Sequence, residues 1–512
     1  MADPRGTVLF LAEAAGMVMN AVWPEVEVRL DYVTDTDAGA MARLRTRLMA
    51  GEGPDVLLDY TDGALLEGLY KRIPAGFLCD MAPYYEQTGF DPADYCAAAL
   101  ASGQYRDGQY LMPVCMDFDM AVSTDGALSA AGLSAEDLAD PRRFVAAQRA
   151  AAQGGPLWRD PGWYQFAHGF KRGGPGDTTG TQQDRPWDDG GQLARDGPER
   201  RFLKSRFHLL MSLYPSCVDY TAQQARFGVD GLQDFFALCR AQYPDAQAHL
   251  ADSSPLPAFL DGGTALLRCN SQDFSNYCAT LNTELQWPVA VVPQNDEGGV
   301  TAHVAVAAGI AGGSQNKANA WRFISSLMAN IPQQGVGRNY RDYTPVRLAD
   351  QEDSYRQQAM RTGFDARDVL VEYLAMRPGD EAWEKRGTYE AWLRCFFTDT
   401  GQPQWWARVQ AGEFDLTPQQ WGSLEQSDPL VRDFRLREEV QKNMPRELKQ
   451  AVGVKPAVQA LTRAAQSIDR AILDPEAYSL LFGAMVPYIQ GRADYETCCQ
   501  KAPRDVDFYF DE

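Results

Sequence analysis

The sequence predicts an α/β protein built from more than one lobe. The chain has 512 residues, which is too long for one small hydrophobic core. Met41, Leu44 and Leu48 share one face of a helix, and Gly-Glu-Gly-Pro at positions 51–54 ends that helix. The apolar run at residues 55–58 is then suited to a buried parallel strand. A helix that leads into a buried strand is typical of α/β sheets.

Two further strands are expected ahead of this stretch. Residues 7–11 form a continuous apolar run, which predicts the first strand of a parallel sheet, and Glu13 follows at its carboxyl end. Residues 24–30 alternate apolar and polar side chains, which predicts a second strand. Open α/β sheets hold their ligands at the carboxyl ends of parallel strands, so the polar residues that follow these strands are candidate ligand contacts.

Later segments add helices and one long irregular region. Two helices are expected to be amphipathic, with one buried face each. Those faces carry Leu232, Phe235, Phe236 and Cys239 in the first helix, and Trp321, Ile324 and Met328 in the second. Residues 108–114 predict a strand. Residues 154–197 are rich in Gly, Pro and Asp without any periodicity, which predicts a long irregular excursion that contains Trp163 and Tyr164.

Composition and motif content exclude several functions. The formal net charge of −21 argues against a nucleic-acid partner, because a phosphate backbone needs a basic face. No apolar run approaches the ~20 residues that a membrane span requires. The sequence contains no nucleophile elbow, P-loop or zincin motif. These observations point away from nucleic-acid binding and from the commonest hydrolases.

Cysteine and histidine spacing does not predict a metal site. The 10 cysteines form no CxxC pair, and the 4 histidines lie far apart without a liganding pattern. We therefore expect no metal and no cofactor. A chain of this length is stabilised by its core, so we expect mostly free, buried thiols that behave as small apolar side chains.

Several short segments, in order along the chain, together resemble one family. "LMAGEGPDVLL" at 48–58 is similar to a signature of the type 1 (maltose-binding-like) extracellular solute-binding proteins, which serve ABC importers. "WPEVEV" at 23–28, "CVDYTAQQARFGVD" at 217–230, "SQNKANAWRFISSLM" at 314–328 and the closing segment at 485–512 also resemble segments of that family, in particular of its large clostridial-type members. The resemblance covers nearly the whole chain.

The resemblance implies a two-lobed periplasmic-binding-protein-like fold of type II. Each lobe would be a mostly parallel sheet flanked by helices, and hinge crossings would join the lobes. Lobe 1 is expected to comprise residues 1–116 and 298–345. Lobe 2 is expected to comprise residues 117–297 and 346–512, including a helical C-terminal extension.

The family's ligand loops can be carried onto positions of this sequence. They imply the ligand-binding residues Glu13, Asp59, Tyr60, Asp62, Asp117, Phe118, Asp119, Asn270, Gln272, Asp273 and Tyr343, with Trp163 and Tyr164 added from the irregular excursion. Six of these side chains are carboxylates, which would crowd one cleft. Buried carboxylates need ligand hydroxyls, a cation or partner arginines.

Three functions follow, in order of preference. The first is capture of a neutral oligosaccharide by hinge closure and delivery to the ABC permease. The second is capture of a cationic ligand such as an amino sugar, a peptide or a polyamine. The third is a carbohydrate-active enzyme that would use Asp117 and Asp119 as an acid and base pair. It is the least favoured of the three, and we expect a protein that is not an enzyme and has no catalytic residues. A surface protein that kept the fold but lost transport is a further alternative.

The resemblance also implies location and partners. We expect an extracellular, cell-surface lipoprotein whose signal sequence and anchor cysteine lie outside the sequence in hand. The expected partners are a small-molecule ligand and the permease subunits, with no nucleic acid, no membrane contact other than a lipid anchor, and a monomeric state.

Overall fold

The computed structural model describes a defined part of the chain. Its residues are 7–33, 38–61, 73–151, 158–159, 184–185, 188–189, 198–220, 222–246, 265–271, 274, 288–330, 343–361, 377–379, 383, 407–408, 410–412 and 454–511. The chain divides into two compact units. The first comprises residues 1–272, 289–354 and 463–512, and the second comprises residues 273–288 and 355–462. The two hydrophobic cores and the polar site described below belong to the first unit.

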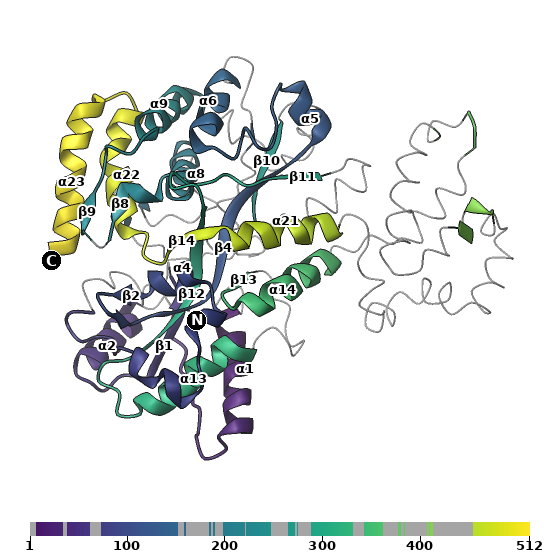
Figure 1. Ribbon diagram of the computed structural model, residues 1–512. Coiled ribbons are helices and arrows are strands. Elements are labelled where there is room, and N and C mark those ends of the chain that lie inside the picture. The colour runs from purple at the N-terminus through teal and green to yellow at the C-terminus, as the bar shows by residue number, and fades with distance from the viewer. Residues whose placement is uncertain are drawn as a thin grey trace. The chain divides into compact units, whose positions relative to one another are not determined.

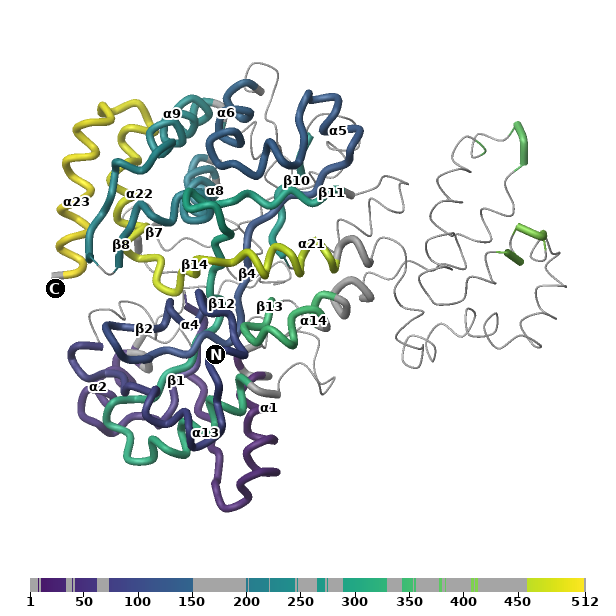
Figure 2. Tube along the Cα trace, in the orientation of Figure 1, coloured from purple at the N-terminus to yellow at the C-terminus, as the bar shows by residue number. Residues whose placement is uncertain are grey.

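The helices and strands follow one another along the chain as Figures 1 and 2 show. The helices are α1 (Thr7–Val22), α2 (Ala38–Met49), α4 (Ala97–Ser102), α5 (Asp125–Ala130), α6 (Pro141–Ala151), α8 (Pro198–Leu213), α9 (Leu232–Gln242), α13 (Lys317–Asn330), α14 (Leu348–Arg361), α21 (Val454–Gln466), α22 (Glu476–Ile489) and α23 (Tyr495–Asp511). The strands of the large sheet are β1 (Val56–Tyr60), β4 (Met112–Thr124), β5 (Trp158–Arg159), β10 (Leu266–Asn270), β11 (Pro288–Val291), β12 (Val300–Ile310), β13 (Thr344–Pro345) and β14 (Ile468–Ile472). Short two-stranded ribbons are β2–β3 (Gln104–Tyr105, Gly108–Gln109), β6–β7 (Asp184–Arg185, Asp188–Asp189) and β8–β9 (Val218–Asp219, Gln224–Ala225).

A mixed eight-stranded sheet is the framework of the fold. Its main path is β1–β12–β4–β10–β5, with β11 and β13 also paired to β4 and β14 paired to β12. β12 is antiparallel to both β1 and β4, and β10 is antiparallel to β4. The β5 and β14 pairings are parallel. The predicted α/β class is confirmed, whereas β1, for which a parallel pairing was expected, is antiparallel to β12.

The N-terminal core lies between helices and one end of this sheet. α1 and α13 lie side by side (Figure 1) and pack on the sheet face that carries Val306 and Ala308 of β12. Ala307 belongs to a cluster on the opposite face, which Leu44 and Leu48 of α2 cover. Helices therefore cover both faces of this part of the sheet, as α/β layering requires.

The second core is built from α6, α8, α9, α22 and α23. The ring centroid of Phe482 on α22 lies 5.8 Å from the ring centroid of Phe207 on α8 and 6.2 Å from that of Phe236 on α9. α22 and α23 pack side by side at the C-terminal end of the chain (Figure 2). The apolar face predicted for residues 232–239 is confirmed, because all four of its side chains on α9 are fully buried.

Strand β4 joins the two cores. All 13 of its residues are buried. Met112 to Met116 contribute to the N-terminal core, and Ala121 belongs to the second. The partner changes midway: Phe118 is the last residue paired with β12, and Asp119 is the first paired with β10. Asp117 to Asp119 therefore lie where the strand passes between cores, as expected for a hinge crossing, while the exact lobe boundaries remain a prediction.

The predicted first strand at residues 7–11 is wrong. The segment is the start of α1. Its apolar run belongs to a longer pattern in which Val8, Leu11, Ala15 and Met19 are buried at helical spacing. Alanines in the middle of that pattern favour a helix over a strand. Glu13, expected at a strand end, instead lies within α1 and is exposed.

The predicted second strand at residues 24–30 is also not formed. The chain from Trp23 to Val33 has no helix or strand after a turn at residues 24–25. Val26 and Val28 are half-buried against the N-terminal core, and Glu27 pairs with Arg29 at the surface. The alternation therefore reflects packing of an irregular segment on the core.

Two further sequence predictions concern membrane spans and thiols. None of the helices within the described residues is long and apolar enough to cross a bilayer. Eight cysteines are described, and all are free thiols. Six of them are buried, as the sequence predicts.

Trp321 occupies the centre of the N-terminal core, as its helical pattern predicts. Its side chain is 0% exposed. The indole Nε1 donates to Thr88 Oγ1 at 2.9 Å, and the ring centroid lies 5.0 Å from that of Tyr85 and 5.3 Å from that of Phe90. Such packing makes this ring a major contributor to the stability of the core.

Trp321→Ala should lower the free energy of unfolding by about 3–5 kcal/mol, because it leaves a cavity among packed rings. Urea denaturation followed by circular dichroism measures this change. Met17 on α1 is 52% exposed and provides the control; Met17→Ala should change stability by less than about 0.5 kcal/mol. Equal losses in the two variants would contradict the central position of Trp321.

Candidate functional site

A polar cluster lies on one face of the sheet where β4 changes partner. Asp117 and Asp119 are two residues apart on β4 and so point to the same face. His303 of β12 is directly opposite Asp117, and Asn270 of β10 is directly opposite Asp119. Arg268, two residues before Asn270, shares that face. Three adjacent strands therefore direct polar side chains into a region that is otherwise apolar.

Asp119 is held by a buried ion pair. Arg268 Nη2 lies 2.8 Å from Asp119 Oδ2, and the two side chains are 0% and 5% exposed. Ser212 of α8 donates a hydrogen bond to the same oxygen. Arg268 Nη1 also donates to Ser205 Oγ at 3.3 Å, and Ser205, like Ser212, belongs to α8. α8 thus covers the carboxylate and its guanidinium partner together.

Asp117 is bound by the chain that follows β10. Its Oδ1 accepts from the backbone N–H of Ser271 at 3.0 Å, from the Ser271 hydroxyl, and from its neighbour Phe118 N–H at 2.8 Å. Ser271 Oγ lies 3.2 Å from Thr344 Oγ1 of β13. Asp117 therefore links β4 to β10 and β13 at the same crossing.

The proton arrangement around Ser212 identifies the donor on His303. Ser212 Oγ contacts Asp119, the His208 carbonyl oxygen at 3.0 Å and His303 Nε2 at 3.2 Å. The hydroxyl has one proton, and the carboxylate and carbonyl can only accept. The Ser212–His303 bond therefore requires the proton on His303 Nε2. Half-buried His303 extends the network from the buried ion pair toward solvent.

The structure brings several of the predicted ligand residues to this cluster. Asp117 and Asp119 lie in it, and Asn270 borders it, fully buried. Phe118 is buried on the opposite face of β4. Tyr343 is buried and directly precedes β13, whose Thr344 contacts Ser271.

Asp59 and Tyr60 occupy the end of β1. Asp59 is 7% exposed and pairs across the sheet with Ala307. The next residue, Thr61, donates through its N–H to Ala305 O at 3.1 Å and through its hydroxyl to Val304 O. The carboxyl end of β1 therefore reaches the backbone beside His303. Asp62, Trp163, Tyr164, Gln272 and Asp273 lie outside the described residues.

Sequence reasoning missed the partners of the two aspartates. They are Ser212, Arg268, Ser271, His303 and Thr344. One local signal was available: Arg268 interrupts the apolar run of β10, where a charge needs a partner. The others are common polar residues with no distinguishing pattern.

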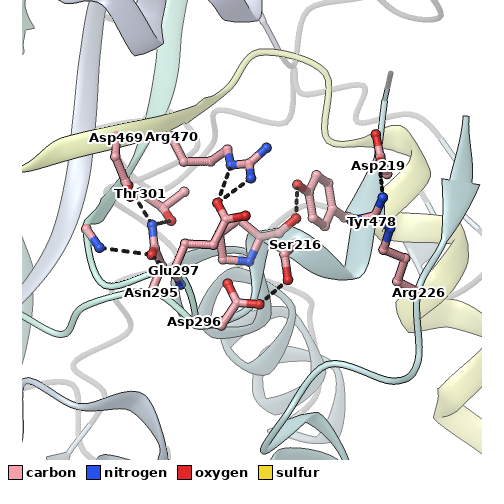
Figure 3. A network of polar contacts seen from close by, with 12 residues as sticks. Ser216, Asp219, Arg226, Asn295, Asp296, Glu297, Thr301, Asp469, Arg470 and Tyr478 are labelled. Atoms are coloured by element: carbon pink, nitrogen blue, oxygen red, sulfur yellow. Dashed lines mark hydrogen bonds and ion pairs between the residues drawn. The ribbon is translucent and has the colours of Figure 1, made fainter. Parts of the chain in front are cut away.

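A second polar network stabilises the turn that leads into β12 (Figure 3). The Asn295 side chain donates to Thr301 Oγ1 at 3.2 Å and to Asp469 Oδ1 of β14 at 2.8 Å. Its oxygen accepts from the backbone N–H of Glu297 at 2.9 Å and of Gly299 at 3.1 Å. Every hydrogen-bonding position of this carboxamide is used. The turn, residues 295–299, is thereby fixed to β14.

Packing at this turn leaves no room for a larger residue at position 299. A Cβ on Gly299 would lie 2.0 Å from Asp469 Cγ. Glu297 forms an ion pair with Arg470 of β14 (Figure 3). Asp296 accepts a hydrogen bond from Ser216, which ties the turn to the end of α8 and the segment after it. These contacts tie the start of β12 to β14 and to the segment that follows α8.

Comparisons with known proteins give the following matches. No protein-family model and no curated protein matches this sequence. The chain is similar to a cyclic alpha-maltosyl-1,6-maltose binding protein from Arthrobacter globiformis, with 13% identity, a TM-score of 0.47, and 99% of this chain and 96% of that chain covered. It is also similar to the sugar-binding protein MalE from Xanthomonas citri, with 13% identity, a TM-score of 0.48, and coverage of 98% and 95%. It is similar as well to the ABC substrate-binding protein Lmo0181 from Listeria monocytogenes, with 12% identity, a TM-score of 0.44, and 97% of this chain and 95% of that chain covered. At these TM-scores the matches do not by themselves assign a family or a ligand.

Asp296 gives the turn a pH-dependent contribution to stability. Burial raises the pKa of its carboxyl, and the hydrogen bond from Ser216 opposes part of that rise. The folded state then binds more protons than the unfolded chain in the range above the unfolded pKa of about 3.9. Stability from this residue is therefore lost as pH rises through that range.

Asp296→Asn removes the titrating carboxyl, and the new amide oxygen can still accept a hydrogen bond from Ser216. The part of the stability that this carboxyl loses as pH rises should therefore no longer be lost. We expect the variant to lose less stability than the wild type between about pH 4 and 7, measured as urea midpoints. Asp107→Asn, at the exposed β2–β3 turn, is the control and should follow the wild type. Parallel pH curves for wild type and Asp296→Asn would show that this carboxyl does not titrate abnormally.

Proposed function

We propose that this protein is an extracytoplasmic solute-binding protein of an ABC importer that captures a carbohydrate, first of all a neutral oligosaccharide. The observation that carries the proposal is the polar cluster on the strands that pass between two helix-covered cores. The family resemblance along the sequence supports the same function. Hydrogen-bonding side chains of Asp, Asn, Arg, Ser and His at such a crossing match the hydroxyl groups of a sugar.

The proposed mechanism is mechanical. β4 passes between the cores at Asp117 to Asp119, and β12 begins at the turn anchored by Asn295. Small backbone rotations at the crossing would move one core against the other, as in hinge closure around a solute. A ligand that contacts the cluster only in the closed form shifts the population toward that form. The closed form would then be recognised by the permease.

Binding is favoured over hydrolysis by the state of the two aspartates. Both already accept hydrogen bonds from protein groups: Asp119 from Ser212 and Arg268, and Asp117 from Ser271. A glycosidase pair needs one carboxyl that delivers a proton to the glycosidic oxygen. The proposal therefore includes no catalytic residue. From the family resemblance it also includes a cell-surface location with a lipid anchor, and a monomer that docks on permease subunits.

Titration calorimetry and thermal shift with cellotriose, maltotriose, a peptide and spermidine test the proposed function. We expect one neutral oligosaccharide to bind and to raise the melting temperature, since a ligand bound only to the folded state stabilises it. Product analysis by chromatography after the titration should show the sugar unchanged. Response to the peptide or spermidine alone would favour the cationic-ligand alternative, and cleavage of the sugar would favour the enzyme.

Trp163→Ala should weaken oligosaccharide binding by about 1–3 kcal/mol if its ring stacks on the sugar, with little change in stability. Calorimetry measures the first quantity and thermal melting the second. A large fall in melting temperature with affinity intact would mean that Trp163 is a core residue.

A further inference from the structure

The segment that follows α1 carries a row of apolar side chains that the protein covers only in part. We call residues 26–33 the return segment. Val26 and Val28 are half-buried against the N-terminal core. Leu30 and Tyr32 continue the same alternation but are 37% and 46% exposed. The first half of the row is therefore packed on the core, whereas the second half faces solvent.

The return segment lies beside α1, which adds a further exposed apolar side chain. A Cβ on Gly16 of α1 would lie 3.7 Å from Val28 Cγ1, so the segment packs on the helix. Burial and the charge of Glu13 raise the pKa of the Tyr32 hydroxyl, which places that ring near the same helix. Met17 is four residues after Glu13 on one helix face and is 52% exposed. Exposed apolar side chains that gather in one region are typical of interaction surfaces.

The backbone of the return segment is also open to a partner. Val26 N–H donates to Trp23 O at 3.0 Å, and residues 27–33 make no backbone–backbone hydrogen bond with any other part of the chain that the structure describes. Unpaired N–H and C=O groups are a template on which another chain can add as a strand. An extended peptide that adds there gains main-chain hydrogen bonds, and its alternate side chains reach the apolar row.

The charges around the row determine which partner fits. Glu27 pairs with Arg29 at 3.0 Å. Glu13 and Asp31 are exposed, and neither forms an ion pair within the described ranges. The uncompensated charge is therefore negative, in a chain whose net charge is −21. A second copy would bring the same carboxylates and an anionic lipid surface would bring phosphates, so like charges oppose both, whereas basic side chains are attracted.

We propose that the return segment and the adjoining face of α1 form a docking surface for an extended, basic segment of a partner protein. The partner adds as a strand to residues 27–33. Its apolar side chains pack on Leu30 and Tyr32, and its Lys or Arg side chains lie near Glu13 and Asp31. This inference goes beyond the proposed function and does not depend on it, because it uses none of the residues of the polar cluster on β4.

Fluorescence polarisation with labelled peptides and amide hydrogen exchange test this inference. The probe is a peptide in which lysine and valine alternate. A glutamate–valine peptide reverses its charge, and a lysine–serine peptide removes its apolar side chains, so these two peptides are the controls. The proteins are the wild type, Leu30→Ser/Tyr32→Ser, Glu13→Gln/Asp31→Asn and Asp507→Asn/Phe508→Ser. The last is the control variant: it removes a carboxylate and a 62% exposed ring from α23.

We expect the lysine–valine peptide to bind the wild type with a Kd below about 1 mM, and neither control peptide to bind in that range. Amides within residues 27–33 that face the added strand should exchange more slowly in the complex, because they gain a hydrogen bond. Leu30→Ser/Tyr32→Ser should weaken binding at least about tenfold, because it removes the apolar contact. Glu13→Gln/Asp31→Asn should weaken it by about twofold to tenfold at low ionic strength, and the control variant should stay within about twofold of the wild type.

Four outcomes overturn the inference. They are no binding of the lysine–valine peptide, equal binding of either control peptide, wild-type affinity in Leu30→Ser/Tyr32→Ser, and slower exchange confined to residues outside 27–33. Sedimentation that shows self-association of the wild type but not of Leu30→Ser/Tyr32→Ser would assign the surface to a second copy instead. Circular dichroism checks that the variants fold, and the exchange map of the wild type decides if one does not. Sugar titrations test carbohydrate binding separately, so failure here leaves the proposed function in place.

Discussion

Strand β4 imposes the constraint on which the rest of the structure depends. It is 13 residues long and buried throughout, so its backbone N–H and C=O groups must be paired with neighbouring strands along its length. β12 pairs with the first part and β10 with the last, and the change of partner falls at Phe118 and Asp119. The side chains at that junction face three strands and a helix at once, which is why Asp117 and Asp119 each find more than one hydrogen-bond donor there.

The polar cluster also defines how the elements are arranged around β4. A buried ion pair contributes little net stability, because removing two charges from water costs about as much as their attraction returns. It does penalise any arrangement that separates the partners. Arg268 on β10, Ser212 on α8 and Asp119 on β4 meet in the register that the sheet adopts. A slip of one residue between β4 and β10 would turn Asp119 and Arg268 to opposite faces of the sheet. The cluster therefore specifies the alignment of these three elements more than it adds to their stability.

The parts of the fold that the sequence predicts are those with a local pattern. α2 with β1, the apolar face of α9 and the buried face of α13 follow from spacing within about a dozen residues. The five-residue apolar run at 7–11 taken alone predicts a strand, whereas the helical spacing of buried residues that continues to Met19 accounts for α1. The antiparallel pairing of β1 with β12 joins positions about 250 residues apart, and no local pattern reports its direction.

The same limit applies to the site. Asp117 and Asp119 could be chosen from the sequence because the family resemblance places a crossing there. Their partners could not, because Ser212 is 93 positions and Arg268 is 149 positions from Asp119. Ser271 is 154 positions from Asp117. Only the folded sheet brings these residues together.

Two thiols among the described residues are natural attachment points. Cys79 packs at the edge of the N-terminal core and Cys499 at the edge of the second, and both are partly exposed, whereas the other described thiols are buried. Burial raises the pKa of both thiols, so maleimide coupling would proceed fastest under mildly alkaline conditions. A donor and an acceptor fluorophore at these two cysteines would report the separation of the two cores in single molecules, without any engineered residue among those described.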